Sequence, residues 1–171
     1  MSIPQWKKNL GGHAGVSYAS AELSKRGIPN APLPEGFPNH DLFAGKWGGS
    51  LLYYIQVKSC HPDHRGDKFR LNECHDKWAD EDNNNQFVIF VCLGRTDVNN
   101  PEKNEGPRYW IAANKQVGQA CKEIKNSGCQ SSGNKERRFH VPCEREGCLY
   151  CLKKEWENNW KLFADLMPPA K

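Results

Sequence analysis

A strand pattern dominates the middle of the chain, where apolar and polar side chains alternate through residues 51–58, LLYYIQVK. Aromatic and β-branched residues favour extended structure. The preceding GKWGGS supplies glycines for a turn, so residues 41–58 are predicted to form a β-hairpin. Successive side chains of a strand point to opposite faces. Gln56 and Lys58 are therefore expected to share one face, with Val57 on the other.

The remaining segments predict a mixture of helices and strands. Residues 28–40 contain four prolines and are expected to be irregular, residues 59–85 form a polar stretch with a short helix near 73–81, and residues 125–138 form a loop. The other predicted elements are helices over residues 12–27, 114–125 and 155–166 and strands over residues 86–94 and 107–113. This order predicts an α/β fold with a central mixed β-sheet flanked by helices.

Length and composition indicate one globular domain. The 171 residues include 37% hydrophobic residues, with six Trp, five Tyr and seven Phe, which is too apolar for a disordered chain. No apolar run approaches the roughly 20 residues that cross a bilayer. The N-terminus lacks the apolar core of a signal peptide. We therefore expect a soluble, cytoplasmic protein that does not bind membranes.

Charge and cysteine content narrow the function only slightly. The net charge of +4 is compatible with a polyanionic partner but does not require one. The eight cysteines are expected to be free thiols or metal ligands, because disulfides are rare in the reducing cell interior.

An acidic helix residue, an aspartate at a hairpin and a Gln-x-Lys strand end follow one another in this chain. They are Glu22, Asp41 and Gln56-Val57-Lys58. In this order the chain resembles the PD-(D/E)xK nuclease superfamily, which has the restriction endonuclease-like fold. The resemblance covers residues 12 to about 120 and rests on the segments GVSYASAELSKRGI, PNHDLF, YYIQVKS, FVIFVCLG and RYWIAA.

The chain departs from the superfamily pattern at two places. Asn39-His40 stands where a proline often precedes the aspartate, and Gln56 replaces the usual acid, which is a known variant. The resemblance implies a nuclease core over residues 1–120, on which a Cys-rich segment and C-terminal helix over residues 121–171 would pack.

The resemblance also implies catalytic roles for Glu22, Asp41, Gln56 and Lys58. Asp41 would be the main ligand of Mg²⁺ or Mn²⁺, with the Gln56 side-chain oxygen and the Val57 carbonyl as neutral ligands. Glu22 would be a ligand directly or through water. Lys58 would orient or deprotonate the attacking water and stabilise the phosphate. Mg²⁺ prefers hard oxygen ligands and keeps several waters, so one or two carboxylates with neutral oxygens suffice.

Each of these residues also has a simpler interpretation. Glu22 precedes Arg26 by one helical turn and is suited to an ion pair with it. Asp41 is also a common type of turn residue, and Gln56 and Lys58 are unremarkable at a strand end. Their joint order favours the catalytic interpretation.

Soft metal ligands gather near the C-terminus. Cys143, Cys148 and Cys151 follow His140, with Cys129 or Cys121 upstream. Structural Zn²⁺ sites use such Cys and His sets, and a zinc ion here would tie the C-terminal helix to the core. The spacing matches no zinc finger, and free thiols packed beside the final helix are an equal alternative.

The polar stretch after Lys58, CHPDHRGDKFRLNECHDKW, carries more histidines and cysteines. Its order is similar to that of a His-Asn-His nuclease, but Asn72 lies too close to His64 and His75 for that ββα-metal motif. We interpret the stretch as a polar loop beside the substrate. Candidate phosphate contacts in it are Arg65, Lys68 and Arg70. A solvated charged loop is an equal alternative.

The sequence therefore predicts a divalent-metal-dependent nuclease that hydrolyses DNA phosphodiester bonds, of a restriction, repair or junction-resolving type. Cleavage of both strands would favour a homodimer, because one such site cuts one strand at a time. Two alternatives stay open. One is a catalytically weak nucleic-acid-binding module on a nuclease-like scaffold, and the other is a zinc-stabilised interaction protein.

Overall fold

A five-stranded mixed sheet forms the centre of the computed structural model, which describes residues 5–61, 68–95, 97–127, 136–140 and 148–168. The strand order is β1-β2-β3-β5-β6. The strands are β1 (Asn30–Pro32), β2 (Leu42–Gly45), β3 (Leu52–Cys60), β5 (Gln86–Cys92) and β6 (Arg108–Ala113). β3 pairs with β5 in parallel, and the other neighbours pair antiparallel.

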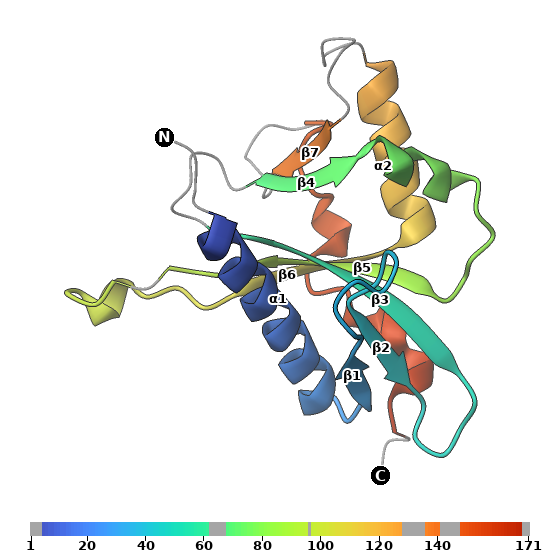
Figure 1. Cartoon of the computed structure of the whole chain (residues 1–171), viewed down its shortest axis with the longest axis horizontal. Helices are drawn as coiled ribbons and strands as arrows, with labels where there is room; N and C mark the ends of the chain where they lie inside the picture. The colour runs from blue at the N-terminus through green and yellow to red at the C-terminus, as the bar shows by residue number, and fades with distance from the viewer. Residues whose placement is uncertain (1–4, 62–67, 96, 128–135, 141–147, 169–171) are drawn as a thin grey trace.

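Helices and a two-stranded sheet cover the two faces of this central sheet. Figure 1 shows α1 on one side and α2, β4 and β7 on the other. The second sheet pairs β4 (Lys68–Asn72) with β7 (Glu136–His140) in antiparallel register. The helices are α1 (Gln5–Lys25), α2 (Asn114–Asn126) and the 3₁₀ helices η1 (Glu73–Ala79), η2 (Pro101–Lys103), η3 (Lys154–Trp156) and η4 (Trp160–Leu166). The predicted α/β class and mixed central sheet are confirmed.

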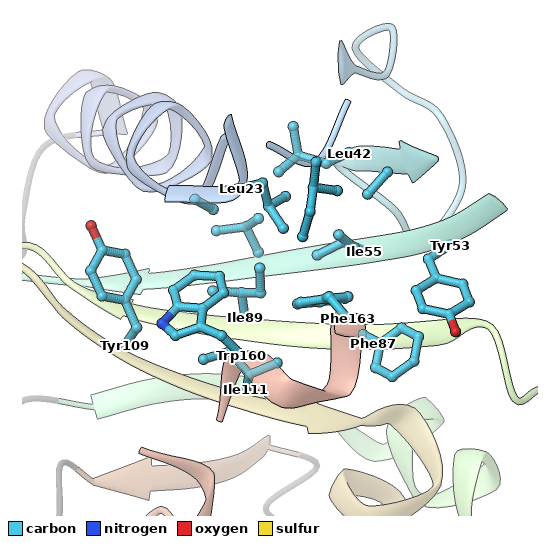
Figure 2. Packing of buried hydrophobic residues seen from close by; sticks show 14 of the residues in the cluster. Leu23, Leu42, Tyr53, Ile55, Phe87, Ile89, Tyr109, Ile111, Trp160 and Phe163 are labelled. Atoms are coloured by element: carbon cyan, nitrogen blue, oxygen red, sulfur yellow. The ribbon is translucent and has the colours of Figure 1, made fainter. Parts of the chain in front are cut away.

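Each face of the sheet carries its own apolar core, because strand side chains alternate between faces. Between the sheet, α1 and η4 lies the α1-side core, part of which is shown in Figure 2. It includes Leu23, Leu42, Tyr53, Ile55, Val57, Phe87, Ile89, Tyr109, Ile111, Trp160 and Phe163. The opposite, α2-side core includes Cys60, Phe69, Leu71, Trp78, Phe90, Trp110, Val117, Cys121, Phe139, Leu152 and Trp156. Residues beyond position 121 therefore contribute to both cores.

Two predicted helices differ from the structure. α1 begins at Gln5, earlier than the predicted start at residue 12. The segment predicted as one terminal helix is divided into η3 and η4, because Asn158 between them has a φ of 50°, which interrupts a right-handed helix. Trp156, Trp160 and Phe163 are nevertheless buried, as their helical spacing indicated.

Three short strands fall in segments predicted to be irregular or looped. They are β1, β4 and β7.

Within the part of the chain that the structure describes, no helix combines the length and the apolar character needed to cross a membrane.

Substitutions at two glycines of α1 would show how closely this helix packs on β3. A Cβ at Gly15 would lie 2.6 Å from the Cβ of Ser59, whereas a Cβ at Gly12 would meet nothing within 4 Å. Gly15→Ala is expected to destabilise the protein by about 1–3 kcal/mol, because it overpacks the contact with β3. Gly12→Ala should instead stabilise it by up to about 1 kcal/mol, because alanine is the better helix former. Urea unfolding compares the two, and equal stabilisation would show that α1 does not approach β3 this closely.

Candidate active site

Asp41 lies immediately before β2, beside the middle of β3. Its backbone N–H donates to the Ile55 carbonyl at 2.9 Å, and its Oδ2 accepts from the Val57 N–H at 2.7 Å. Regular pairing of β2 begins only at Leu42, opposite Ile55. The Asp41 carboxylate therefore accepts the Val57 N–H in place of a backbone carbonyl of β2, and it lies against the Gln56–Val57 peptide.

The Val57 carbonyl points to the same edge of β3 as this carboxylate. In an extended strand, the N–H and C=O of one residue point to the same side. The Val57 N–H reaches Asp41, so the Val57 carbonyl also faces the β2 side of β3, beyond the first paired residue of β2. A charged oxygen and a neutral oxygen thus lie along one short stretch of strand edge.

Gln56 and Lys58 flank Val57 and project from the α2-side face. Val57 belongs to the α1-side core, whereas Cys60 belongs to the α2-side core. Because side chains two residues apart share a face, Gln56 and Lys58 lie on the same face as Cys60. Gln56 is buried and Lys58 is half-buried. The Gln56 Oε1 lies 3.3 Å from Nε2 of the buried His75, on η1. Sequence reasoning missed His75 as a partner of Gln56, since nothing in the sequence places η1 over β3.

The donor set at this strand edge suits a hard cation. Among the residues described, Asp41 Oδ1 has no hydrogen-bond partner, so one carboxylate oxygen is available for a ligand. The same residues contain no group of three or more His, Cys, Asp or Glu side chains that could hold a metal ion. A cation here would therefore depend on one carboxylate, an amide oxygen and a carbonyl, with water completing the shell, which Mg²⁺ tolerates.

The structure does not bring Glu22 to this group. Glu22 Oε1 lies 2.8 Å from Lys25 Nζ, and Oε2 lies 2.6 Å from Arg26 Nη1. The guanidinium of Arg26 in turn covers the ring of Trp160, at 4.1 Å, on the α1 side of the sheet. Hydrogen bonds from Lys25 and then from Arg26 lower the pKa of Glu22. The arrangement matches the simpler ion-pair interpretation and does not support a ligand role.

The pKa of Tyr109, on β6, depends on the nearby charge of Glu22. Burial, followed by the negative charge of Glu22, raises the pKa of Tyr109 to about 12 from an ordinary value of 10.0. The raised pKa means that folding favours the neutral form of Tyr109. The stability that depends on neutral Tyr109 is therefore complete below pH 10 and is lost as the pH rises through about 12. We expect Glu22→Gln to lower the pKa of Tyr109. Absorbance titration of tyrosinate, with Tyr109→Phe to assign the signal, measures it, and an unchanged pKa would contradict this placement of Glu22.

Two of the three predicted phosphate contacts, Lys68 and Arg70, lie on β4. Phe69 and Leu71 enter the α2-side core, so the alternating Lys68 and Arg70 face away from it. Lys68 is half-buried and Arg70 is exposed. Arg65 lies outside the described residues.

The predicted zinc ligands are only partly described. Cys143 lies outside the described residues, whereas Cys148 and Cys151 are half-exposed thiols. A β-bridge aligns His140 with Cys151, and the Leu152 N–H donates to the His140 carbonyl at 2.8 Å. The backbone thus brings His140 alongside Cys151, and the zinc site stays a prediction.

Comparisons with known proteins find similarity in structure but none in sequence. No protein family matches the sequence, and no curated protein matches it. Among solved structures, the chain aligns with the bacterial homing endonuclease I-Ssp6803I at a TM-score of 0.48 and 14% sequence identity. The alignment covers 92% of this chain and 92% of that chain.

Proposed function

We propose that this chain is a divalent-metal-dependent nuclease that hydrolyses phosphodiester bonds in DNA. The observation that carries the proposal is the hydrogen bond from the Val57 N–H to the Asp41 carboxylate. It holds the Asp41 carboxylate against β3 at Val57, and Gln56 and Lys58 are the residues on either side of Val57 in the chain. The order of these residues also supports it, through the sequence resemblance to PD-(D/E)xK nucleases.

Each residue has a defined task in such a reaction. Hydrolysis needs an oriented water and positive charge where negative charge accumulates on the phosphate. A bound Mg²⁺ or Mn²⁺ supplies Lewis acidity and a template for substrate and water. Asp41, the Val57 carbonyl and the Gln56 Oε1 would hold the ion. The Lys58 amine positions or deprotonates the attacking water, and its charge offsets that of the phosphate.

The outward face of β4 supports binding of the DNA backbone. Lys68 and Arg70 lie on this face, and β4 follows β3 in the chain. Such contacts to phosphate raise affinity in a salt-dependent way without reading sequence. Arg65 is proposed for the same role on its position in the sequence.

The test incubates the purified full chain with supercoiled and branched DNA in Mg²⁺, in Mn²⁺ and in chelator. Nicking or cutting that requires the metal is the expected result. Cleavage that is equal in chelator would contradict the metal requirement, and absence of both binding and cleavage would contradict a DNA-directed function. Sedimentation of the protein on and off DNA tests the proposed homodimer in the same buffers.

One observation favours a second candidate, a nucleic-acid-binding module with little catalysis. Gln56 carries no charge, so the proposed cation would have a single anionic ligand, Asp41. A weaker cation site lowers the rate without removing the basic face of β4. Binding of DNA without cleavage in either metal would favour this candidate.

The proposed zinc site has a test of its own. Elemental analysis of the purified protein should find about one zinc per chain, reduced in Cys148→Ser, if the Cys-rich segment binds the ion. A fully folded wild type without zinc would contradict the site and leave the nuclease proposal unaffected.

A further inference from the structure

A buried histidine contacts the one unusual member of the candidate site. His75 is 5% exposed and Gln56 is 8% exposed, and 3.3 Å separates the His75 Nε2 from the Gln56 Oε1. For this contact to be a hydrogen bond, the His75 Nε2 carries the proton and donates to the amide oxygen. An amide oxygen has two lone pairs, so the second lone pair of Oε1 is left for a cation.

The histidine ring also contacts a tryptophan of its own helix. Its ring packs edge-on against Trp78, with ring centroids 4.3 Å apart. η1, which carries both residues, lies directly on α2, since a Cβ at Gly118 would come within 2.3 Å of the Ala79 nitrogen. Asp76 Oδ2 also lies 3.8 Å from Lys125 Nζ of α2. The position of the imidazole is therefore set by the packing of η1 on α2.

An amide needs such a partner in a way that a carboxylate does not. The two ends of the Gln56 side chain have nearly the same shape, but only the oxygen end binds a cation. While the His75 Nε2 carries the proton, a rotated amide would turn its NH₂ group toward the His75 N–H, leaving two donors facing each other. An Asp or Glu at this position would offer oxygen at both ends and would need no help with orientation.

We propose that His75 is a positioning residue, which fixes the rotamer of the Gln56 amide so that its oxygen serves the cation site. This inference rests on the proposed function, because it assigns Gln56 Oε1 to the cation. It explains how a chain with Gln in place of the usual acid keeps an oriented oxygen ligand there.

The test is a double-mutant cycle that compares His75→Ala alone with His75→Ala in the Gln56→Glu background. Mn²⁺ affinity is measured by calorimetry, and kcat and KM for DNA cleavage are measured separately. In the Gln56 protein, His75→Ala should lower Mn²⁺ affinity and kcat by about 10- to 100-fold, the usual cost of losing a residue that orients a metal ligand. In the Gln56→Glu background, the same substitution should cost less than about 3-fold, because both carboxylate ends are oxygens.

Two further variants separate orientation from folding. His75→Gln, which places an amide N–H at a reach similar to that of Nε2, should recover part of the lost Mn²⁺ affinity. His13→Gln, at an exposed position of α1, should change nothing. Thermal unfolding of each variant checks that the fold is kept.

The outcomes distinguish this inference from the proposed function. Equal losses from His75→Ala in both backgrounds, with an active metal-binding wild type, would overturn the positioning role alone. A wild type that neither binds Mn²⁺ nor cleaves DNA would overturn the proposed function and this inference with it.

Discussion

Asp41→Asn is expected to reduce metal-dependent DNA cleavage by roughly 10²- to 10³-fold. Asp41 would be the sole anionic ligand at the strand edge, and a catalytic metal contributes several kcal/mol of transition-state stabilisation. Asparagine retains an oxygen that can accept from the Val57 N–H, so the hydrogen bond now measured at 2.7 Å can persist. Initial rates over a range of Mg²⁺ concentrations should show a weaker metal dependence in the variant.

The matched control is Asp80→Asn. Asp80 is an exposed carboxylate that pairs with Lys122 at 2.6 Å, and surface ion pairs contribute little. Cleavage by this variant should equal that of the wild type. If Asp41→Asn cleaved DNA as fast as Asp80→Asn, Asp41 would not be a metal ligand.

Lys58→Met is expected to lower kcat by roughly 10²- to 10⁴-fold while leaving Mn²⁺ affinity near the wild-type value. Methionine keeps an unbranched apolar side chain of similar length but cannot transfer a proton or offset phosphate charge, and proton transfer by a positioned side chain contributes on this scale. Single-turnover cleavage and Mn²⁺ calorimetry measure the two quantities separately. A lower kcat with unchanged Mn²⁺ affinity would show that Lys58 acts on the attacking water and is not a ligand of the ion.

Lys115→Met, at an exposed position at the start of α2, provides the control for loss of a positive charge. It should change cleavage by less than about 2-fold, in line with the small contributions of exposed charges. A Lys58→Met variant as active as this control would remove Lys58 from the proposed mechanism.

The strands that define the site could be predicted because their patterns are local. β3 combines β-forming residues with strict alternation, and the glycines before it favour a turn, so hairpin and facing side chains follow from the sequence. The apolar run of β5 is equally clear. The distance between Asp41 and β3 did not follow from alternation, because it depends on the register of Leu42 with Ile55.

Strands that depend on distant partners escaped prediction. β7 contains one apolar residue, Phe139, among polar ones, and it pairs with β4 from the other half of the chain. β1 ends at Pro32, which a sheet accepts only where no ladder N–H is needed, as at this edge. β4 does alternate, through Phe69 and Leu71, but its polar neighbours concealed the signal.

The candidate site residues also divide into those placed by local sequence patterns and those placed by contacts between distant segments. Gln56 and Lys58 take their positions from one strand, so their shared face was predictable. The ion pair of Glu22 with Arg26 was likewise predictable, because residues four apart on a helix are neighbours. The distance of Glu22 from Asp41 was not, because it depends on how α1 packs on the sheet. His75 reaches Gln56 only because η1 rests on α2, and neither sequence spacing nor periodicity encodes that contact.

Anomalous diffraction from crystals of the wild-type protein soaked with Mn²⁺ would locate the ion directly. We expect a Mn²⁺ peak within coordination distance of the Asp41 carboxylate, the Val57 carbonyl and the Gln56 Oε1, with the Lys58 amine nearby. A Mn²⁺ peak elsewhere in a protein that cleaves DNA, with none beside Asp41, would contradict a catalytic cation site at this edge of β3.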